Sequence, residues 1–372
     1  MINRTRLLAI ARKEVIQLRR DTRSLMLAFL LPVLLLILFG YAISWDVNHI
    51  PMAVVDQDRS PQSRELQDTF RASGYFEITA RPERAADAEH LLATQDVWVV
   101  VVIPPGFAND LGAGRTATLQ ALFDGSDANS ATIALGYARA LVQSYATRVV
   151  LQTTRVTPPV DIRSRVWYNE ELTSRNMIVP GLVAVIMMII AAMLTALTIA
   201  REWERGTMEQ LIATPVHRVE VVIGKILPYV GIALFDVIVV TVVGVVVFGV
   251  PFRGSIVLLM GLTLAFLIGA LGLGVFISAA AKSQLLATQI AMLATFLPAF
   301  LLSGFMFDVA IMPPVLRAIS YLIPARYFLV VTRGIFLKGV GVEALAVQGL
   351  LMIVFAACGI MAAVRAFRKE IQ

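Results

Sequence analysis

Six long apolar segments constrain the folding of this chain more than any other feature of its sequence. Each holds at least 20 residues, enough for an α-helix to cross a hydrocarbon core about 30 Å thick. The segments are residues 25–44, 177–200, 221–250, 256–281, 285–307 and 344–364. Hydrophobic residues make up 58% of the chain, whereas soluble domains hold roughly 45–50%. The sequence therefore predicts a polytopic α-helical membrane protein with six transmembrane helices.

Lysine and arginine residues predict the orientation of these helices, because short cytoplasmic segments carry an excess of them. Fourteen lie in residues 1–24, 201–220, 282–284 and 365–372, whereas the short connections on the other side hold five. Four of those five fall in residues 308–343, which is the exception to the pattern. Both termini are therefore expected in the cytoplasm. The first segment exceeds a usual signal peptide in length, so we expect it to be retained as an anchor.

The basic balance of the chain does not indicate a nucleic-acid partner. The net charge is +6, but residues 45–176 hold 12 Lys and Arg against 16 Asp and Glu. The excess of positive charge therefore belongs to the membrane segments and their flanks, where positive-inside bias and anionic lipids explain it. The lipid bilayer is the expected surroundings of this chain, and nucleic acid is excluded.

Residues 45–176 are expected to form an extracytoplasmic α/β domain inserted between the first two transmembrane helices. Runs rich in β-branched and aromatic residues alternate with helical patterns, which is typical of a mixed or parallel sheet. The expected strands are residues 52–55, 75–79, 97–103 and 118–124, with a further one at 161–168. The expected helices are residues 60–72, 83–93, 104–111 and 129–151.

No catalytic residues, metal ligands or cofactor site are expected in this chain. The acidic pairs Asp56/Asp58 and Asp124/Asp127 follow strands, where Asp commonly caps turns. The three histidines are scattered, and the single cysteine, Cys358, lies in the last apolar segment. No G-x-x-x-x-G-K-[ST] sequence is present, so the usual phosphate-binding loop is missing. The sequence favours a binding or docking role for the α/β domain over an enzymatic one.

The segment REWERGTMEQLIATP, residues 201–215, carries five charges between the second and third apolar segments. Its position requires that it lie at a membrane surface. Strong helix formers closed by Pro215 predict a short helix on the water side. Two interpretations are open: a solvated connection that only turns the chain, or a charged surface that binds a soluble partner.

Asp236 is the one acidic residue deep within a predicted transmembrane helix, ~22 Å along it at 1.5 Å per residue. An intramembrane carboxylate is costly, so it marks either a functional cavity or a hydrogen bond between helices. Lys225, near the cytoplasmic end of the same helix, is expected to extend to the lipid headgroups. Small residues in the fourth segment predict close helix packing. These are Gly261, Gly269, Gly272 and Gly274.

Two further segments are expected at the membrane interfaces. Residues 3–20 form an amphipathic pattern, typical of a helix that lies flat in the cytoplasmic interface. In residues 308–343, Pro313-Pro314 interrupts the chain. Helices are expected at 315–323 and 325–337, with Tyr321, Tyr327 and Phe328 at the level of the headgroups.

Together these motifs resemble the ABC-2 type transporter permeases, over nearly the full length of the chain. The matching sequences are E-x-E-R-G-T-x-E-x-L at residues 202–211, and S-G-F followed by I-P-A-R-Y-F, which ends at Phe328. The likeness is greatest to the bacterial efflux branch with a large extracytoplasmic domain. It implies that an ATPase subunit contacts the N-terminal helix and Arg201, Glu202, Glu204, Arg205, Gly206, Thr207 and Glu209. It also implies an outer re-entrant segment that includes Pro324, Arg326, Tyr327 and Phe328.

The resemblance further implies the permease subunit of an ABC exporter in the bacterial inner membrane. Such a subunit moves a small hydrophobic compound or drug outward, while ATP and Mg bind to a separate ATPase chain. A second permease copy or paralogue would complete the pathway, and a periplasmic adaptor protein is a further candidate partner. Two alternatives remain open. One is an ATPase-coupled protein that transmits force to the envelope, and the other is a secondary transporter that uses Asp236.

Overall fold

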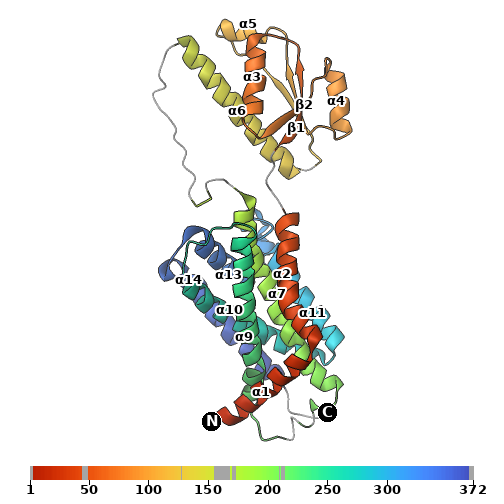
Figure 1. The fold of residues 1–372 in the computed structure, drawn as a ribbon, viewed down its shortest axis with the longest axis vertical. Coiled ribbons are helices and arrows are strands. Elements are labelled where there is room, and N and C mark those ends of the chain that lie inside the picture. Colours follow the sequence, from red (N-terminus) through yellow and green to blue (C-terminus); the bar gives the residue numbers. More distant parts are fainter. Residues whose placement is uncertain are drawn as a thin grey trace. The chain divides into compact units, whose positions relative to one another are not determined.

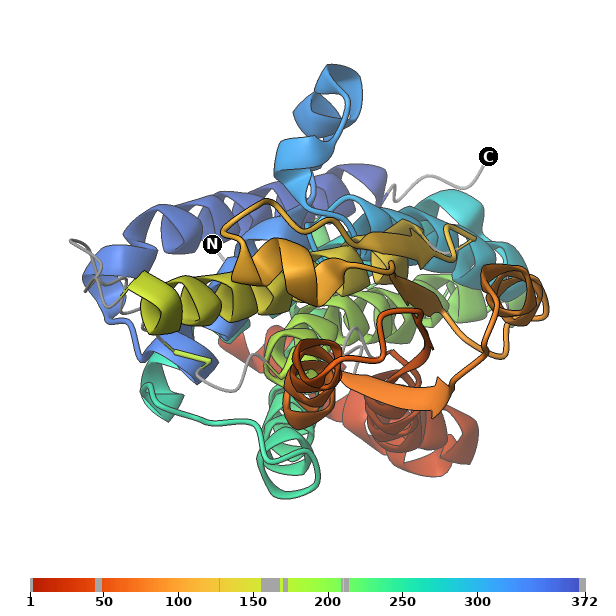
Figure 2. The same cartoon turned by 90° about the horizontal axis from the view of Figure 1, so that it is seen from above.

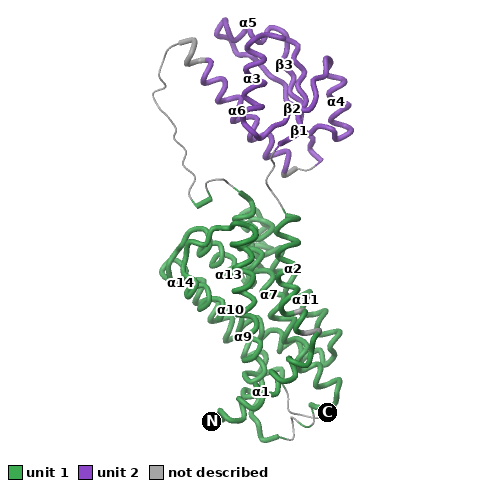
Figure 3. The backbone as a smooth tube through the Cα atoms, in the orientation of Figure 1, with its two compact units in different colours: residues 1–43, 166–372 green, residues 44–165 purple. Residues whose placement is uncertain are grey.

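The chain forms two compact units, a helical unit and an α/β unit. The structure is a computed structural model that describes residues 3–43, 49–126, 128–154, 168–169, 173–208, 210 and 214–367. The helical unit comprises Met1–Ile43 and Val166–Gln372, and the α/β unit comprises Ser44–Arg165 (Figures 1 and 3). Of the residues that we expected in the extracytoplasmic domain, the described residues 168–169 and 173–176 group with the helical unit.

The helical unit contains long apolar helices and several short ones (Figure 1). The elements up to residue 301 are α1 Arg4–Arg20, α2 Thr22–Ala42, α7 Ser174–Glu204, α9 Arg218–Val246, α10 Ile256–Ala281 and α11 Gln284–Leu301. The remaining ones are η1 Val309–Ile311, α12 Pro314–Ser320, α13 Pro324–Arg333, η2 Gly334–Lys338 and α14 Val342–Ala366.

Among the described residues, five helices are long and apolar enough to cross a membrane: α7, α9, α10, α11 and α14. The segment from Pro314 to Lys338 bends by 77° and would raise the number to six if it counts as one span. The first predicted segment forms α2, whose apolar portion Ala28–Ala42 is shorter. A polytopic helical protein is confirmed, whereas a total of six transmembrane helices stays a prediction.

Helix α7 is the core of the helical unit. In its most apolar stretch 89% of the residues are buried within the chain, against 44% or less in the other four long helices. It packs against α2, α9, α10, α11 and α13 (Figures 1 and 2). A displacement of α7 would therefore reach most of the membrane helices.

Glycines allow α10 to approach its neighbours closely. A Cβ atom at Gly272 would lie 2.7 Å from the carbonyl carbon of Gly359 in α14, and one at Gly274 would lie 2.3 Å from the carbonyl oxygen of Ala192 in α7. The expected packing role is confirmed at these positions and at Gly269. It is wrong for Gly261, where a Cβ atom would meet no other group within 4 Å.

The α/β unit is a mixed sheet with helices on both faces, and its place outside the membrane stays a prediction. Strands β1 Ile50–Asp56, β2 Phe76–Ala80, β3 Val99–Ile103 and β4 Gln120–Phe123 are arranged in the order β2-β1-β3-β4. The first three strands run parallel, and β4 pairs antiparallel with β3. The helices are α3 Pro61–Ala72, α4 Ala85–Ala93, α5 Phe107–Gly112 and α6 Ala128–Thr154. Most of the additional strand expected at 161–168 lies outside the described residues.

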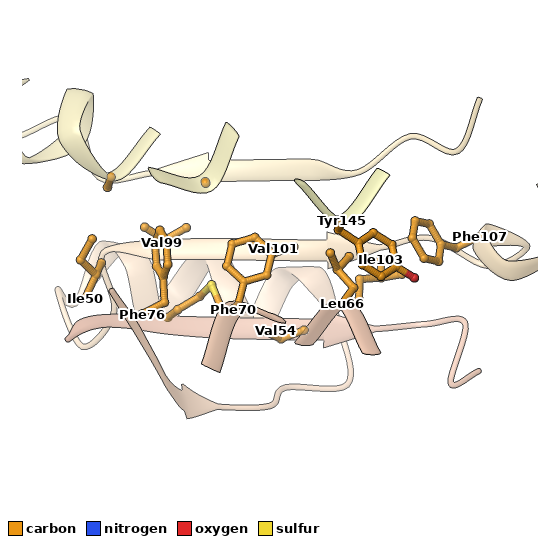
Figure 4. Packing of buried hydrophobic residues seen from close by; sticks show 13 residues of the cluster. Ile50, Val54, Leu66, Phe70, Phe76, Val99, Val101, Ile103, Phe107 and Tyr145 are labelled. Atoms are coloured by element: carbon orange, nitrogen blue, oxygen red, sulfur yellow. The ribbon is translucent and has the colours of Figure 1, made fainter. Parts of the chain in front are cut away.

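Alternation along β1 and β3 divides the core of this unit into two layers. Val99, Val101 and Ile103 face a cluster with Leu66 and Phe70 of α3 (Figure 4). Tyr145 of α6 completes this layer, and its hydroxyl donates to the carbonyl oxygen of Gln62. On the opposite face, Val100 and Val102 pack with Ala88 of α4.

The acidic residues after the strands hold turns, as the sequence predicts. Asp56 accepts hydrogen bonds from the backbone N–H of Arg59 (2.9 Å) and from the Ser63 hydroxyl (2.7 Å). Asp58 accepts from the backbone N–H groups of Gly106 and Ala108, at 2.8 and 3.1 Å. Asp124 accepts from the N–H of Ser126. Asp127 lies outside the described residues.

Candidate functional site

The candidate site lies where α7 ends, beside α1 and the start of α9. Residues 201–204 form the last turn of α7 and so continue the second predicted span, which we had expected to end at residue 200. Glu202 is 3% exposed, and its Oε1 lies 2.6 Å from Nζ of Lys13 in α1. Its Oε2 lies 3.1 Å from Nζ of Lys225 in α9, an ionic contact without hydrogen-bond geometry. One carboxylate thus joins three helices.

Lys225 is the buried centre of this arrangement. It donates a 2.7 Å hydrogen bond to Oε1 of Glu14, and the two side chains are 1% and 3% exposed. Lys13, Glu14, Glu202 and Lys225, here termed the charge cluster, supply two cations and two anions. Charged groups leave water at a large free-energy cost unless they are paired. The expectation that Lys225 extends to the headgroups is wrong, because these buried carboxylates bind it inside the protein.

Two further contacts bond the last turn of α7 to neighbouring elements. Arg201 Nη1 lies 2.7 Å from Oδ2 of Asp21, the residue between α1 and α2. Glu204 accepts hydrogen bonds from the backbone N–H of Gln284 (2.7 Å) and from its side-chain amide, at the start of α11. Arg201, Glu202 and Glu204, all expected to face a partner protein, therefore have charged or polar partners within this chain.

Helix α1 is held by protein contacts along its length, in addition to the interfacial position that its pattern predicts. The backbone N–H of Asn3 donates a 2.7 Å hydrogen bond to Glu220 at the start of α9, and Arg6 donates to the carbonyl oxygen of Pro215. Gly224 of α9 lets Ile10 approach, since a Cβ atom there would lie 3.0 Å from the Ile10 side chain. The first helix and the third predicted span therefore form one packed block at this end.

The surface beside the charge cluster is open. Arg205 and Gly206 are exposed, and Gly206 has φ of +68°, a left-handed conformation that favours glycine. The hydroxyl of Thr207 donates to the carbonyl oxygen of Glu202. A hollow of about 340 Å³ is lined by Lys13, Gln17, Arg201, Glu202, Arg205, Thr207, Gln210 and Thr214. Glu209, the remaining predicted contact residue, lies outside the described residues.

The pairing of Glu14 with Lys225 was not predicted, although the sequence contains an indication of it. Glu14 falls on the apolar stripe of α1, one turn after Ile10 and Ala11 and one turn before Leu18, and all four are buried. An acid on an apolar stripe and a lysine within an apolar helix each require a partner of opposite charge. Because Glu14 and Lys225 both break an apolar pattern and carry opposite charges, their pairing could have been predicted.

Asp236 is 2% exposed on α9, and its Oδ2 has no hydrogen-bond partner among the described residues. A hydrogen bond between helices, one of the two roles considered for it, is therefore not found at this oxygen. Across the same described residues, no group of three or more His, Cys, Asp or Glu is arranged to hold a metal ion.

The predicted outer segment places its four motif residues at the bend between α12 and α13. Pro324 begins α13. Arg326 donates to the Ser320 hydroxyl and covers the ring of Tyr321, and the Tyr327 hydroxyl donates to the Tyr321 carbonyl oxygen. Phe328 is fully buried and stacks on Phe266 of α10 at a centroid distance of 4.2 Å. Phe328 therefore packs within the protein, and its level relative to the headgroups stays a prediction.

Comparison with known proteins places this architecture in a family. The model of the ABC-2 family transporter proteins matches residues 23–364. The probable multidrug ABC transporter permease YbhS of Escherichia coli is 36% identical over 339 residues, which cover 90% of this chain and 89% of the relative. YbhR of the same organism is 31% identical over 344 residues, 91% of each chain. ABC transporter G family member 20 of Dictyostelium discoideum is 22% identical, and the match covers 46% of that protein.

The apolar helices and these matches define the class of this protein: it is a polytopic membrane permease rather than an enzyme. The chain belongs to the ABC-2 family of transporter proteins.

Proposed function

We propose that this chain is the membrane-spanning permease subunit of an ABC exporter and that a separate subunit hydrolyses the ATP. The charge cluster carries this proposal. It bonds the end of the central helix α7 to α1 and α9, directly beside the exposed residues Arg205 and Gly206. A soluble subunit that binds this surface would act on the helix around which the helical unit is built.

Burial of Glu14, Glu202 and Lys225 in the charge cluster gives the mechanism its physical basis, whereas Lys13 is half exposed. Separating a buried ion pair leaves uncompensated charge, so α1 and the adjoining ends of α7 and α9 should move together. ATP-driven closure of two ATPase subunits would displace this block. The displacement would shift the equilibrium between inward- and outward-facing states of the permease. ATP and Mg would bind to the ATPase chains, and the residues of this chain would receive the motion.

The proposed orientation puts α1, residues 201–220 and both termini in the cytoplasm, with the α/β unit outside. The asymmetry of Lys and Arg supports it, and the Escherichia coli relatives favour a bacterial inner membrane. Alkaline phosphatase fused after Ser126 should be active, and the same enzyme fused after Gln284 should be inactive. The opposite pattern would exclude this orientation.

We propose a small hydrophobic compound or drug as the substrate, because two relatives that match along almost their whole length are named as multidrug permeases. Asp236 is the candidate residue of the substrate pathway. In sequence it has no acid, histidine or lysine within two turns, which disfavours a proton relay. Asp236→Asn should therefore retain ATP-driven transport. Loss of transport at normal membrane abundance would favour the secondary-transporter alternative.

Purification of the full chain from its native membrane tests the proposed function. An ABC ATPase should be recovered in near-equal amount with the permease, together with a second permease copy or a paralogue. ATP hydrolysis by the purified complex should respond to transported compounds. Recovery of the permease without any ATPase, under conditions that preserve other membrane complexes, would contradict the proposal.

A further inference from the structure

A hollow of about 280 Å³ opens at the edge of the sheet in the α/β unit. It lies where β3 begins and β4 ends, and one side of α6 closes it, with Ser130 and Ala134. Trp98 and Asp124 face each other across the strands, since the backbone N–H of Asp124 donates a 2.9 Å hydrogen bond to the carbonyl oxygen of Trp98. The strand register therefore holds an indole and a carboxylate side by side in the wall of the hollow.

Trp98 leaves part of its aromatic surface open. Its side chain is 41% exposed, whereas Val97 and Val99 on either side of it are buried. The open indole lines the hollow and is not part of either hydrophobic layer of the core. Indole is the best of the aromatic side chains at attracting a cation to its face.

Asp124 gives the hollow its charge. Hydrogen bonds from the side chain and the backbone N–H of Ser126 lower the pKa of its carboxyl group below the usual value of 3.8, so the group is ionised at neutral pH. Of the described residues that line the hollow, none is Lys, Arg or His. The start of α6 contributes a partial positive charge of about one half, which the full charge of the carboxylate exceeds. The hollow is therefore net negative.

We propose that this hollow is a binding site for a small organic cation, an amine or quaternary ammonium compound. The cation would lie on the indole of Trp98 and pair with the carboxylate of Asp124. Ala131 and Ala134 leave space because their side chains are small. The volume is just below the roughly 300–1,000 Å³ of pockets for drug-sized ligands, so the ligand is smaller than a typical drug. The site is independent of the proposed ATPase-coupling surface.

Choline and its neutral isostere 3,3-dimethylbutan-1-ol test the proposal, because they share shape and differ in charge. The full chain, purified in maltoside micelles, would be titrated with each compound and binding measured by saturation-transfer NMR. Choline should bind saturably. The neutral isostere lacks the charge that attracts choline to the carboxylate and the indole face. Its affinity should therefore be lower than that of choline by roughly fivefold or more.

Substitutions of Trp98 and Asp124 test whether these two residues bind choline. Trp98→Leu and Asp124→Asn should each weaken choline binding by roughly three- to tenfold, whereas Trp98→Phe keeps an aromatic face and most of the affinity. Asn at position 124 can still accept the hydrogen bond from Ser126, so folding should be retained. Asp87→Asn, an exposed change on α4, is the matched control. Absence of saturable choline binding, equal binding of the isostere, or unchanged affinity in Asp124→Asn would each overturn the proposal.

Discussion

Lys225 shows how much a single residue contributes to the proposed coupling surface. Its ammonium group is buried between Glu14 and Glu202, at 2.7 and 3.1 Å. Without the ammonium group, the Glu14 carboxyl group would lose its partner of opposite charge in a site that excludes water. We expect this loss to matter more than the loss of a surface ion pair, because exposed pairs contribute only about 0–1 kcal/mol.

Lys225→Met should therefore destabilise the helical unit by about 3–5 kcal/mol, because it leaves a buried carboxylate without its partner. The double change Glu14→Leu with Lys225→Met should recover much of this stability, since it removes both charges together. Thermal unfolding of the solubilised protein measures both effects. Arg12→Met, an exposed change on the same helix α1, should leave the midpoint nearly unchanged. A single variant as stable as the wild type would show that the charge cluster is not a structural unit.

At the scale of residues, the sequence predicted which side chains are charged and near the membrane surface, but not their partners. Glu202 belongs to a motif that suggests an exposed surface, yet α7 continues four residues beyond its predicted end and turns this side chain inward. The direction of a side chain at the end of a helix depends on where the helix stops. That endpoint is among the least predictable features of a sequence.

At the scale of elements, the parallel contact of α10 with α14 depends on glycine. A Cβ atom at Gly272 would lie 2.7 Å from the backbone of Gly359, which cannot move aside as a flexible side chain could. Gly272→Ala should therefore separate the two helices and cost about 1–3 kcal/mol. Gly261→Ala in the same helix should be neutral or stabilising by up to about 1 kcal/mol, because nothing lies within 4 Å and alanine favours helix. The thermal unfolding midpoints of Gly272→Ala and Gly261→Ala test this difference. Equal midpoints would contradict a packing role for Gly272.

In the α/β unit, the loop after β1 is bonded to the start of α5 through Asp58. Hydrogen bonds from the Ser60 side chain and from the N–H groups of Gly106, Phe107 and Ala108 lower the pKa of this carboxyl group below its usual 3.8. A carboxylate with a lowered folded-state pKa stabilises the fold above its unfolded-state pKa. The stabilisation is lost as the pH falls through the folded-state pKa.

The α/β unit should consequently lose stability as the pH is lowered from 6 to below about 4. Asp58→Asn should already be less stable at pH 6, by about 1–2 kcal/mol from weaker hydrogen bonds, and should lose less on acidification. Calorimetry of the full chain at several pH values measures the difference. The exposed change Asp87→Asn should lose as much stability as the wild type. An unchanged pH dependence in Asp58→Asn would exclude this contribution.

At the scale of the whole molecule, periodicity predicted most of the architecture. Long apolar runs gave the membrane helices, and alternating β-branched runs gave the strands of the mixed sheet. The packing of α1 against α9 could not be predicted in this way, because its contacts join residues more than 200 positions apart, such as Lys225 with Glu14. The bend in residues 308–343 was indicated by its prolines, but the burial of Phe328 depends on α10.

Charge reversal at Arg205 tests most directly whether the exposed end of α7 receives the ATPase. Arg205 is exposed, whereas the charges of Arg201 and Glu202 are bonded within the chain. Arg205→Glu should reduce recovery of the ATPase with the purified permease by about tenfold or more, with insertion and folding unchanged. Arg253→Glu, an exposed change in the connection after α9, should recover as much ATPase as the wild type. Normal ATPase recovery and transport in Arg205→Glu would contradict the assignment of this surface.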